Sequence, residues 1–292
     1  MKNIHIEHPE DSILTGDLAV LDAFLMPHHL SVKYDGAPAI VWGTNPATGN
    51  QFVGTKSVFN KVKIKINETH ADIDQNHNGP VAEILHACLD FLPDEDGIIQ
   101  GDFIGFGGSD EFTPNCITYQ FPDTVGGEII VAPHTRYEAE SDLRDAVASP
   151  LKDDQESTDC CLFVQPAAFA DFVGSPLQDR IEFAKQVSTL VDFEDEKAAA
   201  ILKKDLNAFI RDGDEIVPEQ FANYQLVRLW VLVKAIKEQA LDLCCHGDGP
   251  DAWIQDEAVD AEGYVMHTEA GSWKLVDREV FSYANFSMGV GR

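Results

Sequence analysis

The chain has 292 residues, which is long enough for one large domain or two ordinary ones. Hydrophobic residues make up 44% and charged residues 24%, as in globular domains, and no apolar run approaches the roughly 18 residues of a membrane helix. The N-terminal residues lack the apolar stretch of a signal peptide, so we expect a cytoplasmic protein without a membrane partner. The net charge of −29 excludes a globally basic surface, the usual footprint of proteins that grip a phosphate backbone.

The first half of the chain is predicted to be rich in strands. Apolar periodicity indicates helices at 16–26 and 80–92, and a polar loop is expected at 72–79, where Asp72–Gly79 only weakly resembles a calcium loop. Strands at 30–33 and 38–43 are expected to flank a tight turn at Asp35–Pro38. Further strands are expected at 51–58, 97–106, 115–121, 128–133 and 160–165, with an exposed connection at 138–158.

Helices are predicted to dominate the next part. They are expected at 175–191, with Ser175 as the cap and Pro176 in the first turn, at 194–211 and at 218–243, and the last is apolar enough to be well buried. Strands at 261–267 and 272–277 follow. This order of strands, helices and strands indicates an α+β protein, a single domain over 1–292 with a helical insertion at 175–245.

Lys33 is the first candidate for chemistry. The segment Lys33-Tyr34-Asp35-Gly36 places a lysine at the end of a strand, just before a turn that Gly36 permits. A lysine amine that has lost its proton attacks the α-phosphate of a nucleoside triphosphate and holds the nucleotide as a phosphoamide. An ordinary lysine beside an Asp-Gly turn is the competing interpretation of this motif alone.

Three further residues suit phosphoryl transfer. Asp102 lies in an otherwise apolar strand, Glu262 opens a strand together with Gly263, and Lys274 lies inside an apolar strand twelve positions after Glu262. Taken singly, each is explained by local backbone bonding or by a solvated edge. Together with Lys33 they supply a nucleophile, two carboxylates for a divalent metal and a second amine for phosphate.

In this order, the four segments resemble motifs I, III, IV and V of the covalent nucleotidyltransferase superfamily, which contains DNA ligases, RNA ligases and mRNA capping enzymes. The resemblance spans about 31–277 but is carried by four short motifs. Thr55-Lys56-Ser57 resembles the basic segment that follows the nucleophile strand in that superfamily. The segments Glu7–Asp11, Lys33–Ala39 and Thr55–Asn60 also resemble ligase-like proteins of tailed phages, which implies the host-cell cytoplasm.

The resemblance implies a fold, cofactors and roles. The fold would be that of a ligase adenylation domain, with antiparallel sheets, and the cofactors would be ATP and Mg²⁺ or Mn²⁺. The implied roles are AMP attachment at Lys33, support of the lysine or metal by Asp35, close approach of the nucleotide at Gly36, phosphate contact by Lys56 and Lys274, ribose or metal binding by Asp102, and metal binding by Glu262.

The sequence also departs from that superfamily. Pro38 stands where Arg is frequent, and the last motif offers Lys274 without a second lysine. Because 18 residues follow Lys274, we expect no C-terminal OB domain. These departures and the charge leave the acceptor open.

We therefore expect an ATP-dependent polynucleotide ligase of the RNA type, which joins 5′-phosphate to 3′-hydroxyl ends of RNA or DNA. The alternatives are a nucleotidyltransferase with a non-nucleic-acid or RNA-cap acceptor, and a non-catalytic nucleotide-binding phage protein. Both ATP and GTP stay open as the nucleotide, and the sequence does not specify the oligomeric state.

Overall fold

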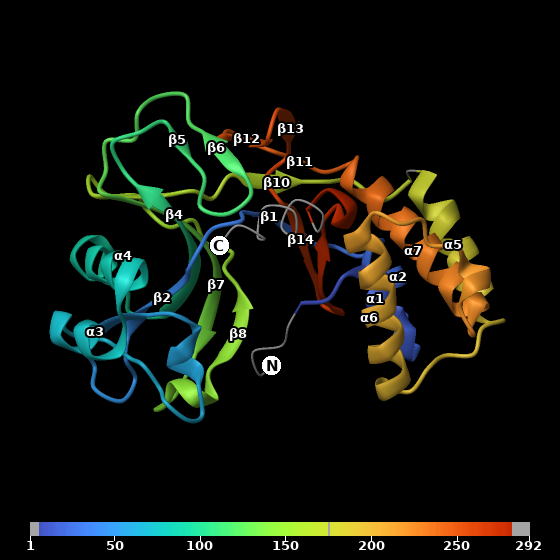
Figure 1. Cartoon of the computed structure of the whole chain (residues 1–292), viewed down its shortest axis with the longest axis horizontal. Helices are drawn as coiled ribbons and strands as arrows, with labels where there is room; N and C mark the ends of the chain where they lie inside the picture. Colours follow the sequence, from blue (N-terminus) through green and yellow to red (C-terminus); the bar gives the residue numbers. More distant parts are fainter. Residues whose placement is uncertain (1–5, 175, 282–292) are drawn as a thin grey trace. The chain divides into compact units, whose positions relative to one another are not determined.

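The computed structural model describes residues 6–174 and 176–281. The described chain divides into two compact units, one made of residues 34–165 and 249–261, the other of residues 6–33, 166–248 and 262–281. We call them the first and the second unit. Each combines helices with mostly antiparallel sheets, so the α+β class is confirmed (Figure 1). The single domain over 1–292 stays a prediction.

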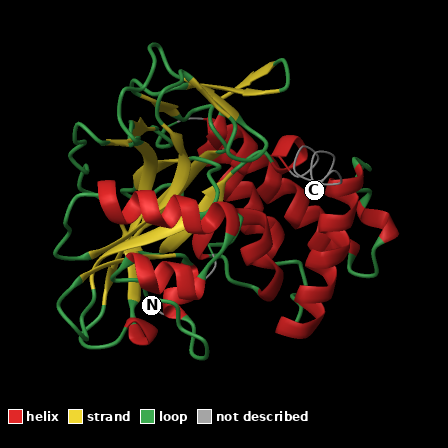
Figure 2. Ribbon diagram, turned by 60° about the vertical axis from the view of Figure 1, so that its left-hand side comes forward, coloured by secondary structure: helices red, strands yellow, loops and turns green. Residues whose placement is uncertain are grey.

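Sheet A forms the centre of the first unit. Its strands run in the order β3 (Gln51–Gly54), β2 (Ala39–Thr44), β4 (Ile98–Phe106), β7 (Ile129–Glu138) and β8 (Val147–Pro150), and β9 (Cys161–Phe163) pairs with β7 in parallel. Figure 2 shows helices across one face of this sheet, where α3 (His70–Asn76) and α4 (Gly79–Phe91) lie. Ile73 and Leu85 of these helices belong to the same apolar core as Ile40, Trp42 and Ile99 of the sheet.

Sheet C is the second sheet of the first unit. It consists of β13 (Glu257–Val259), β12 (Asp251–Ile254), β6 (Thr118–Gln120) and β5 (Glu111–Phe112), in that order. Its strands therefore come from two distant parts of the chain.

Sheet B belongs to the second unit. Its order is β11 (Cys245–His246), β10 (Ala167–Phe169), β1 (His29–Lys33), β14 (Gly263–Thr268) and β15 (Gly271–Leu275). Alternate residues of the last three strands are buried, and β15 lies against α1 (Pro9–Ser12), α2 (Ala19–Ala23) and α7 (Tyr224–Leu241). One face of sheet B is therefore apolar and covered by helices, as the period-2 alternation of a strand requires.

The helical segment of the second unit lies between β10 and β11 in the chain. It contains α5 (Pro176–Ser188), α6 (Glu196–Asp212) and α7 (Figure 1). The expectation of three helices there is confirmed, while Ser175 lies outside the described residues. Among the described helices, none has the length and apolar character to cross a membrane.

Four buried charged residues, which we call the buried ion cluster, join α1 and α7 to the segment after β15. Lys237 Nζ donates to Glu10 Oε1 at 2.8 Å, and Arg278 Nη1 donates to Glu10 and Asp11 at 3.0 Å. Lys237 and Glu10 are fully buried, so their charges are compensated by one another instead of by water. The cations and the hydrogen bond from Lys237 lower the pKa of Glu10 to about 2, although its burial acts in the opposite direction.

Several expectations for the strand-rich half are corrected. The strands on either side of Asp35–Pro38 do not pair with each other, because β1 belongs to sheet B and β2 to sheet A. The backbone after the turn bonds to β4 instead, from Ala37 N–H to the Phe103 carbonyl at 3.0 Å and from Phe103 N–H to the Pro38 carbonyl at 3.1 Å.

Other boundaries shift because local capping overrides the apolar pattern. The helix expected at 16–26 covers only Ala19–Ala23, because Gly16, at φ 87°, ends a short 3-10 turn at Ile13–Thr15. The strand expected at 51–58 ends at Gly54, where Thr55 caps a 3-10 helix over Lys56–Phe59.

The polar segments hold more structure than expected. The loop expected at 72–79 is wrong for its first part, because Thr69 and Asp72 form a capping box that starts α3 at His70. The connection expected at 138–158 contains β8 and a 3-10 turn at Leu143–Asp145. The short strands β5, β10, β11, β12 and β13 had no periodicity long enough to predict them.

Candidate functional site

Lys33 lies at the end of β1 in sheet B, and its amine forms an ion pair with the carboxylate of Glu262. Glu262 directly precedes β14, and its backbone N–H donates to the Lys33 carbonyl at 2.9 Å. The side chains are 23% and 16% exposed, so a ligand from solvent can reach a pair that is largely shielded from water. Two positions that are 229 residues apart in the chain thus form one charged pair.

Lys274 lies on the same face of sheet B as Lys33. Residues opposite each other in an antiparallel pair point to the same face, and the register places Lys33 opposite Gly263 and Lys274 opposite Val265. Val265 and Gly263 are two positions apart, so both lysines project from one face. The other face is the apolar one that the helices cover.

This face, which we call the polar face of sheet B, carries further polar side chains. His267 accepts or donates a hydrogen bond with the Ser272 hydroxyl at 2.8 Å, and the ring of His29 lies 5.9 Å from that of His267. Ser31 lies between His29 and Lys33 on the same face of β1. The full set consists of His29, Ser31, Lys33, His267, Ser272 and Lys274.

Gly263 lies opposite Lys33 on β14. Its φ is +126°, and a Cβ there would lie 2.3 Å from the Leu275 carbonyl oxygen. A side chain at this position is therefore excluded by backbone conformation and by space. The glycine therefore allows close packing of β14 against the backbone of Leu275.

Asp35 and Gly36 belong to the first unit. The Asp35 carboxylate accepts hydrogen bonds from the Asn115 side-chain amide at 2.9 and 3.2 Å and from the Cys116 thiol at 3.3 Å, while the Asp35 backbone N–H donates to the Tyr119 hydroxyl at 2.6 Å. The Asp35 side chain is thus engaged within its own unit.

Gly36 lies directly on β4. A Cβ at Gly36 would lie 2.6 Å from the Phe103 carbonyl oxygen and 2.8 Å from Cβ of Asp102. The turn after the lysine therefore requires glycine for its close packing on the strand that carries Asp102. The role of glycine here is steric.

Asp102 has polar neighbours on sheet A. Its carboxylate lies 3.9 Å from Nε2 of His134, and Nε2 of Gln100 lies 3.3 Å from the same His134 nitrogen. The Tyr137 hydroxyl donates to Gln100 at 2.9 Å. The contact of His134 with Asp102 follows from the pairing of β4 with β7.

Lys56 is exposed on the 3-10 helix after β3, with Thr55 and Ser57 hydroxyls 2.8 Å apart beside it. Lys61 and Lys63 are exposed on the loop that follows, but Lys65 donates to the Asn76 carbonyl at 2.6 Å. These lysines therefore lie on a turn and a loop, beyond the end of β3.

The predicted residues are divided between the two units. Lys33, Glu262 and Lys274 share sheet B, whereas Asp35, Gly36, Lys56 and Asp102 belong to the first unit. Sequence reasoning missed His29, Ser31 and His267, which share the face with Lys33. The alternation of polar and apolar residues at 29–33 was the signal that would have found two of them.

Among the residues that the structure describes, no three His, Cys, Asp or Glu side chains are placed so that all three could hold one metal ion. Mg²⁺ that enters with phosphates is commonly held by one or two carboxylates. A single carboxylate such as Glu262, placed beside two amines, fits a metal that arrives with a triphosphate.

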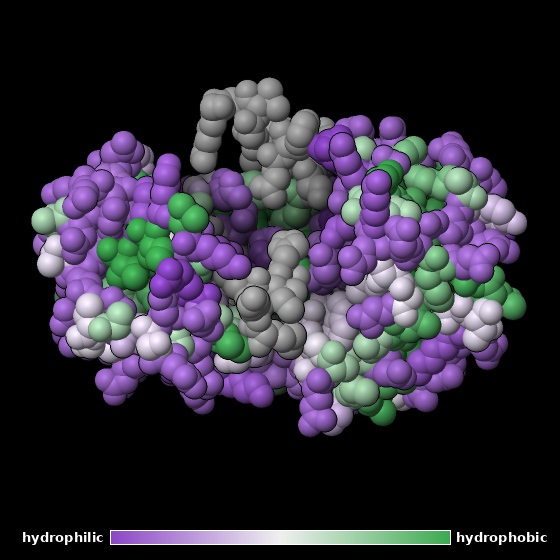
Figure 3. Space-filling view, turned by 90° about the horizontal axis from the view of Figure 1, so that it is seen from below, coloured by the Kyte–Doolittle hydropathy of each residue, from purple (hydrophilic) through white to green (hydrophobic). Residues whose placement is uncertain are grey.

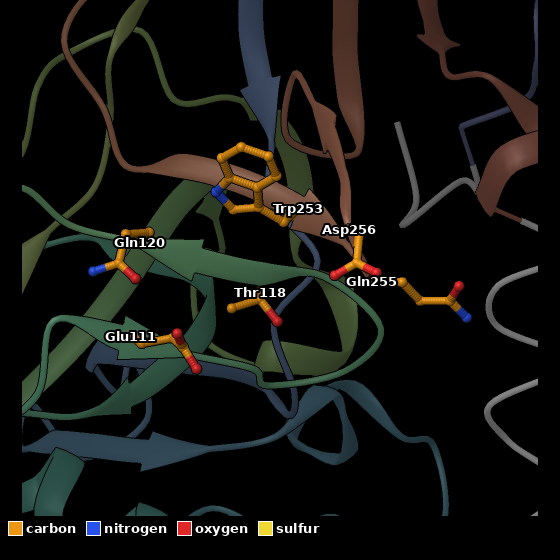
Figure 4. A pocket seen from close by; sticks show the side chains of 6 residues that line it. All are labelled: Glu111, Thr118, Gln120, Trp253, Gln255 and Asp256. Carbon is orange, nitrogen blue, oxygen red and sulfur yellow. The ribbon is translucent and has the colours of Figure 1, made fainter.

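A separate pocket of about 390 Å³ lies on sheet C (Figure 4). None of the residues predicted for nucleotide binding lines it. Its lining residues are Glu111, Thr118, Gln120, Trp253, Gln255 and Asp256.

The surface matches the composition. The face shown in Figure 3 is hydrophilic over most of its area, with scattered apolar patches. Fifty acidic residues against twenty-one Lys and Arg make the excess charge negative.

Comparison with known proteins gives one family. Residues 3–222 and 182–289 match the profile of the family of unknown function DUF6267, in two overlapping stretches that together cover nearly the whole chain. The chain therefore belongs to this family. No curated protein matches it. No solved structure matches it either.

Proposed function

We propose that this DUF6267 protein is an ATP-dependent polynucleotide ligase of the RNA-ligase type, with a ligase adenylation fold and a covalent lysyl-AMP at Lys33. The observation that carries the proposal is the ion pair between Lys33 and Glu262, on a sheet face that also presents Lys274. The four-motif resemblance supports it independently.

Lys33 would act as the nucleophile of the first step. Its neutral amine attacks the α-phosphorus of ATP, an N–P bond forms, the bond from that phosphorus to the leaving oxygen breaks, and pyrophosphate departs. The amine gives up a proton to solvent. This step requires that the ion pair with Glu262 open when the triphosphate arrives, so that the amine is free to attack.

In the second step, a 5′-phosphate oxygen of the polynucleotide attacks the same phosphorus. The N–P bond breaks, Lys33 recovers its proton, and an adenylated 5′ end results. In the third step the 3′-hydroxyl attacks the 5′-phosphate, a phosphodiester forms and AMP leaves. Lys274 would stabilise the charge on the α-phosphate in the first two steps.

Mg²⁺ or Mn²⁺ that binds with ATP would neutralise phosphate charge, with Glu262 as its ligand. Asp102 remains the second proposed metal or ribose ligand. Asp35 and Gly36 would keep the turn after the nucleophile in place, through the contacts with Asn115 and Phe103. Lys56, exposed on its 3-10 helix, would contact a phosphate.

The charge of −29 favours a second candidate function. A protein or small-molecule acceptor, or an RNA cap, needs no long basic groove, and the first step at Lys33 is unchanged. A third candidate, a nucleotide-binding phage protein without catalysis, is favoured by Pro38 and by the single lysine of the last motif.

The test is covalent labelling. Protein freed of bound nucleotide is incubated with α-labelled ATP or GTP and Mg²⁺, and an acid-labile adduct is measured on denaturing gels. We expect a stoichiometric adduct with ATP that disappears in Lys33→Ala. Lys234→Ala is the matched control, because Lys234 is another shielded lysine that pairs with glutamates in the same unit.

The outcomes separate the candidates. No adduct with either nucleotide would overturn both catalytic proposals, and an adduct that persists in Lys33→Ala would overturn the site. Labelled single-stranded RNA, nicked duplex DNA and capped RNA are then offered to the adenylated protein. Transfer to a 5′-phosphate end supports the ligase, and transfer only to another acceptor supports the second candidate.

A further inference from the structure

Two histidines meet on the helical hairpin of the first unit, and neither belongs to the proposed nucleotide site. His70 begins α3 and His86 lies in the middle of α4, and their Nδ1 atoms are 2.7 Å apart. Asp90 accepts from Nε2 of His70 at 3.0 Å, and Asp74 from Nε2 of His86 at 3.1 Å. The cluster is symmetric: each helix contributes one histidine and one aspartate, four residues apart.

The two rings face each other edge to edge. Their centroids are 5.0 Å apart, which is nearly the N···N separation plus the two short distances from each centroid to its nitrogen. The planes differ by 22°, so the rings are close to coplanar. The Nδ1 lone-pair directions of His70 and His86 therefore converge on one point between them.

The aspartates decide which nitrogens carry hydrogen. An ionised carboxylate only accepts hydrogen bonds, so each Nε2 must be the donor. In a neutral imidazole the other nitrogen, Nδ1, is then a bare acceptor. Two bare acceptors at 2.7 Å repel each other, and the arrangement is stable only with a positive centre between them.

We propose that His70 and His86 bind a divalent transition-metal ion through their Nδ1 atoms, with Asp90 and Asp74 as the carboxylates that orient the rings. A carboxylate that accepts the second N–H of a metal-bound histidine fixes its tautomer and increases its basicity. Imidazole ligands suit Zn²⁺, Ni²⁺ and Cu²⁺ more than Mg²⁺ or Ca²⁺.

The site requires a small adjustment of the rings. Zn–N bonds of about 2.0–2.1 Å in a tetrahedral site separate the two nitrogens by roughly 3.3 Å, so the rings must open by well under 1 Å. The side chains of His70 and His86 are 51% and 31% exposed, which leaves room for this motion and for water ligands. The metal would link α3 to α4 at the surface, outside the proposed nucleotide site.

Titration of metal-free protein with Ni²⁺, and separately with Zn²⁺, tests the proposal by calorimetry and by thermal unfolding. We expect one saturable site per chain and a rise in unfolding temperature on saturation. His70→Gln and His86→Gln should each weaken binding at least tenfold and abolish the thermal shift. His28→Gln, which changes a histidine of the second unit, should leave both unchanged.

Asp90→Asn keeps both ligands and removes only one orienting charge. We expect it to weaken binding about 10- to 100-fold while the circular dichroism spectrum stays that of the unchanged protein. Absence of a saturable site in the unchanged protein would show that the pair shares a proton only, and would overturn the proposal. Equal affinity in the His70→Gln/His86→Gln double variant would overturn it as well.

Discussion

The charge of Glu262 in its ion pair with Lys33 can be removed with little change in shape. Glu262→Gln keeps the size and the hydrogen bond to the lysine but removes the negative charge that the proposed chemistry needs. We predict that the rate of adduct formation falls by on the order of 10²–10³, the loss typical of one electrostatic group at a transition state. The initial rate of labelling with α-labelled ATP measures this change. Unchanged labelling would exclude Glu262 from the reaction.

Gly36 offers a test of the turn after the lysine. Gly36→Ala would place a methyl group 2.6 Å from the Phe103 carbonyl oxygen, so the turn or β4 must move. We predict a loss of about 1–3 kcal/mol in the free energy of unfolding, the cost of overpacking a tight site. Urea denaturation measures it. Gly126→Ala is the matched control in the same unit, since a Cβ there meets nothing within 4 Å, and equal effects of the two variants would refute the steric argument.

For single residues, the sequence identified candidate site residues better than it predicted which residues contact one another. Lys33, Glu262 and Lys274 were selected by motif, and sheet B brings them to one unit. The pairing of Glu262 with Lys33 was not predictable, because the register of β1 against β14 sets it across the length of the chain. The contact of Asp102 with His134 depends in the same way on the register of sheet A.

At the scale of elements, α7 shows what an apolar pattern leaves out. Its burial was predicted from the run Leu226–Ile236 and is confirmed, whereas the helix expected at 218–243 covers only Tyr224–Leu241, after a separate 3-10 turn at Pro218–Gln220. The fully buried Lys237 in its last turns was missed, because its partner Glu10 lies 227 residues away. Long periodic helices are specified locally, whereas the short strands of sheet C and the partners of β1 depend on contacts that no local pattern contains.

The buried ion cluster leads to a prediction for α7. Lys237→Met leaves the Glu10 carboxylate buried with Arg278 as its remaining cation, and we expect the free energy of unfolding to fall by about 3 kcal/mol. Lys234→Met on the same helix removes ion pairs with Glu238 and Glu279, which are both exposed, and should cost less than about 1 kcal/mol. Chemical denaturation of both variants checks the difference.

A double variant separates burial of charge from packing. In the Lys237→Met variant, Glu10→Gln removes a carboxylate that has lost one of its cations. Glu10→Gln should therefore lower the free energy of unfolding less in that variant than in the unchanged protein. Additive costs would show that Lys237 and Glu10 are not coupled, against the contact seen in the structure.

At the scale of the whole molecule, the charge of −29 sets the response to acid. Repulsion among carboxylates opposes folding and is reduced both by salt and by protonation, so the bulk charge makes moderate acid stabilising. Buried groups act in the opposite direction. Glu10, whose pKa is lowered to about 2, contributes stability above its ordinary value of 4.5 and loses that contribution as pH falls toward 2.

His8 makes the free energy of unfolding depend on pH in a higher range than Glu10 does. Burial lowers the pKa of His8 from 6.5 to about 2, with Arg278, Lys237 and Lys274 adding to the effect and Glu10 opposing it. Between these values the unfolded chain binds a proton at His8 and the folded chain does not. Above pH 6.5, His8 is neutral in both states and does not reduce the free energy of unfolding. As pH falls below 6.5, the proton taken up by the unfolded chain lowers the free energy of unfolding, by at most about 1.4 kcal/mol per pH unit.

The variant His8→Gln isolates this effect, because it keeps a polar side chain but cannot titrate. We predict that the free energy of unfolding of the unchanged protein minus that of His8→Gln decreases steadily from pH 6.5 to pH 5, a range in which Glu10 stays mostly ionised in both states. Urea denaturation at constant ionic strength measures both proteins and cancels the contribution of the surface carboxylates, which the two share. A difference that does not vary with pH would mean that His8 is protonated equally in the folded and unfolded chain, and that the cations beside Glu10 do not exclude a further positive charge.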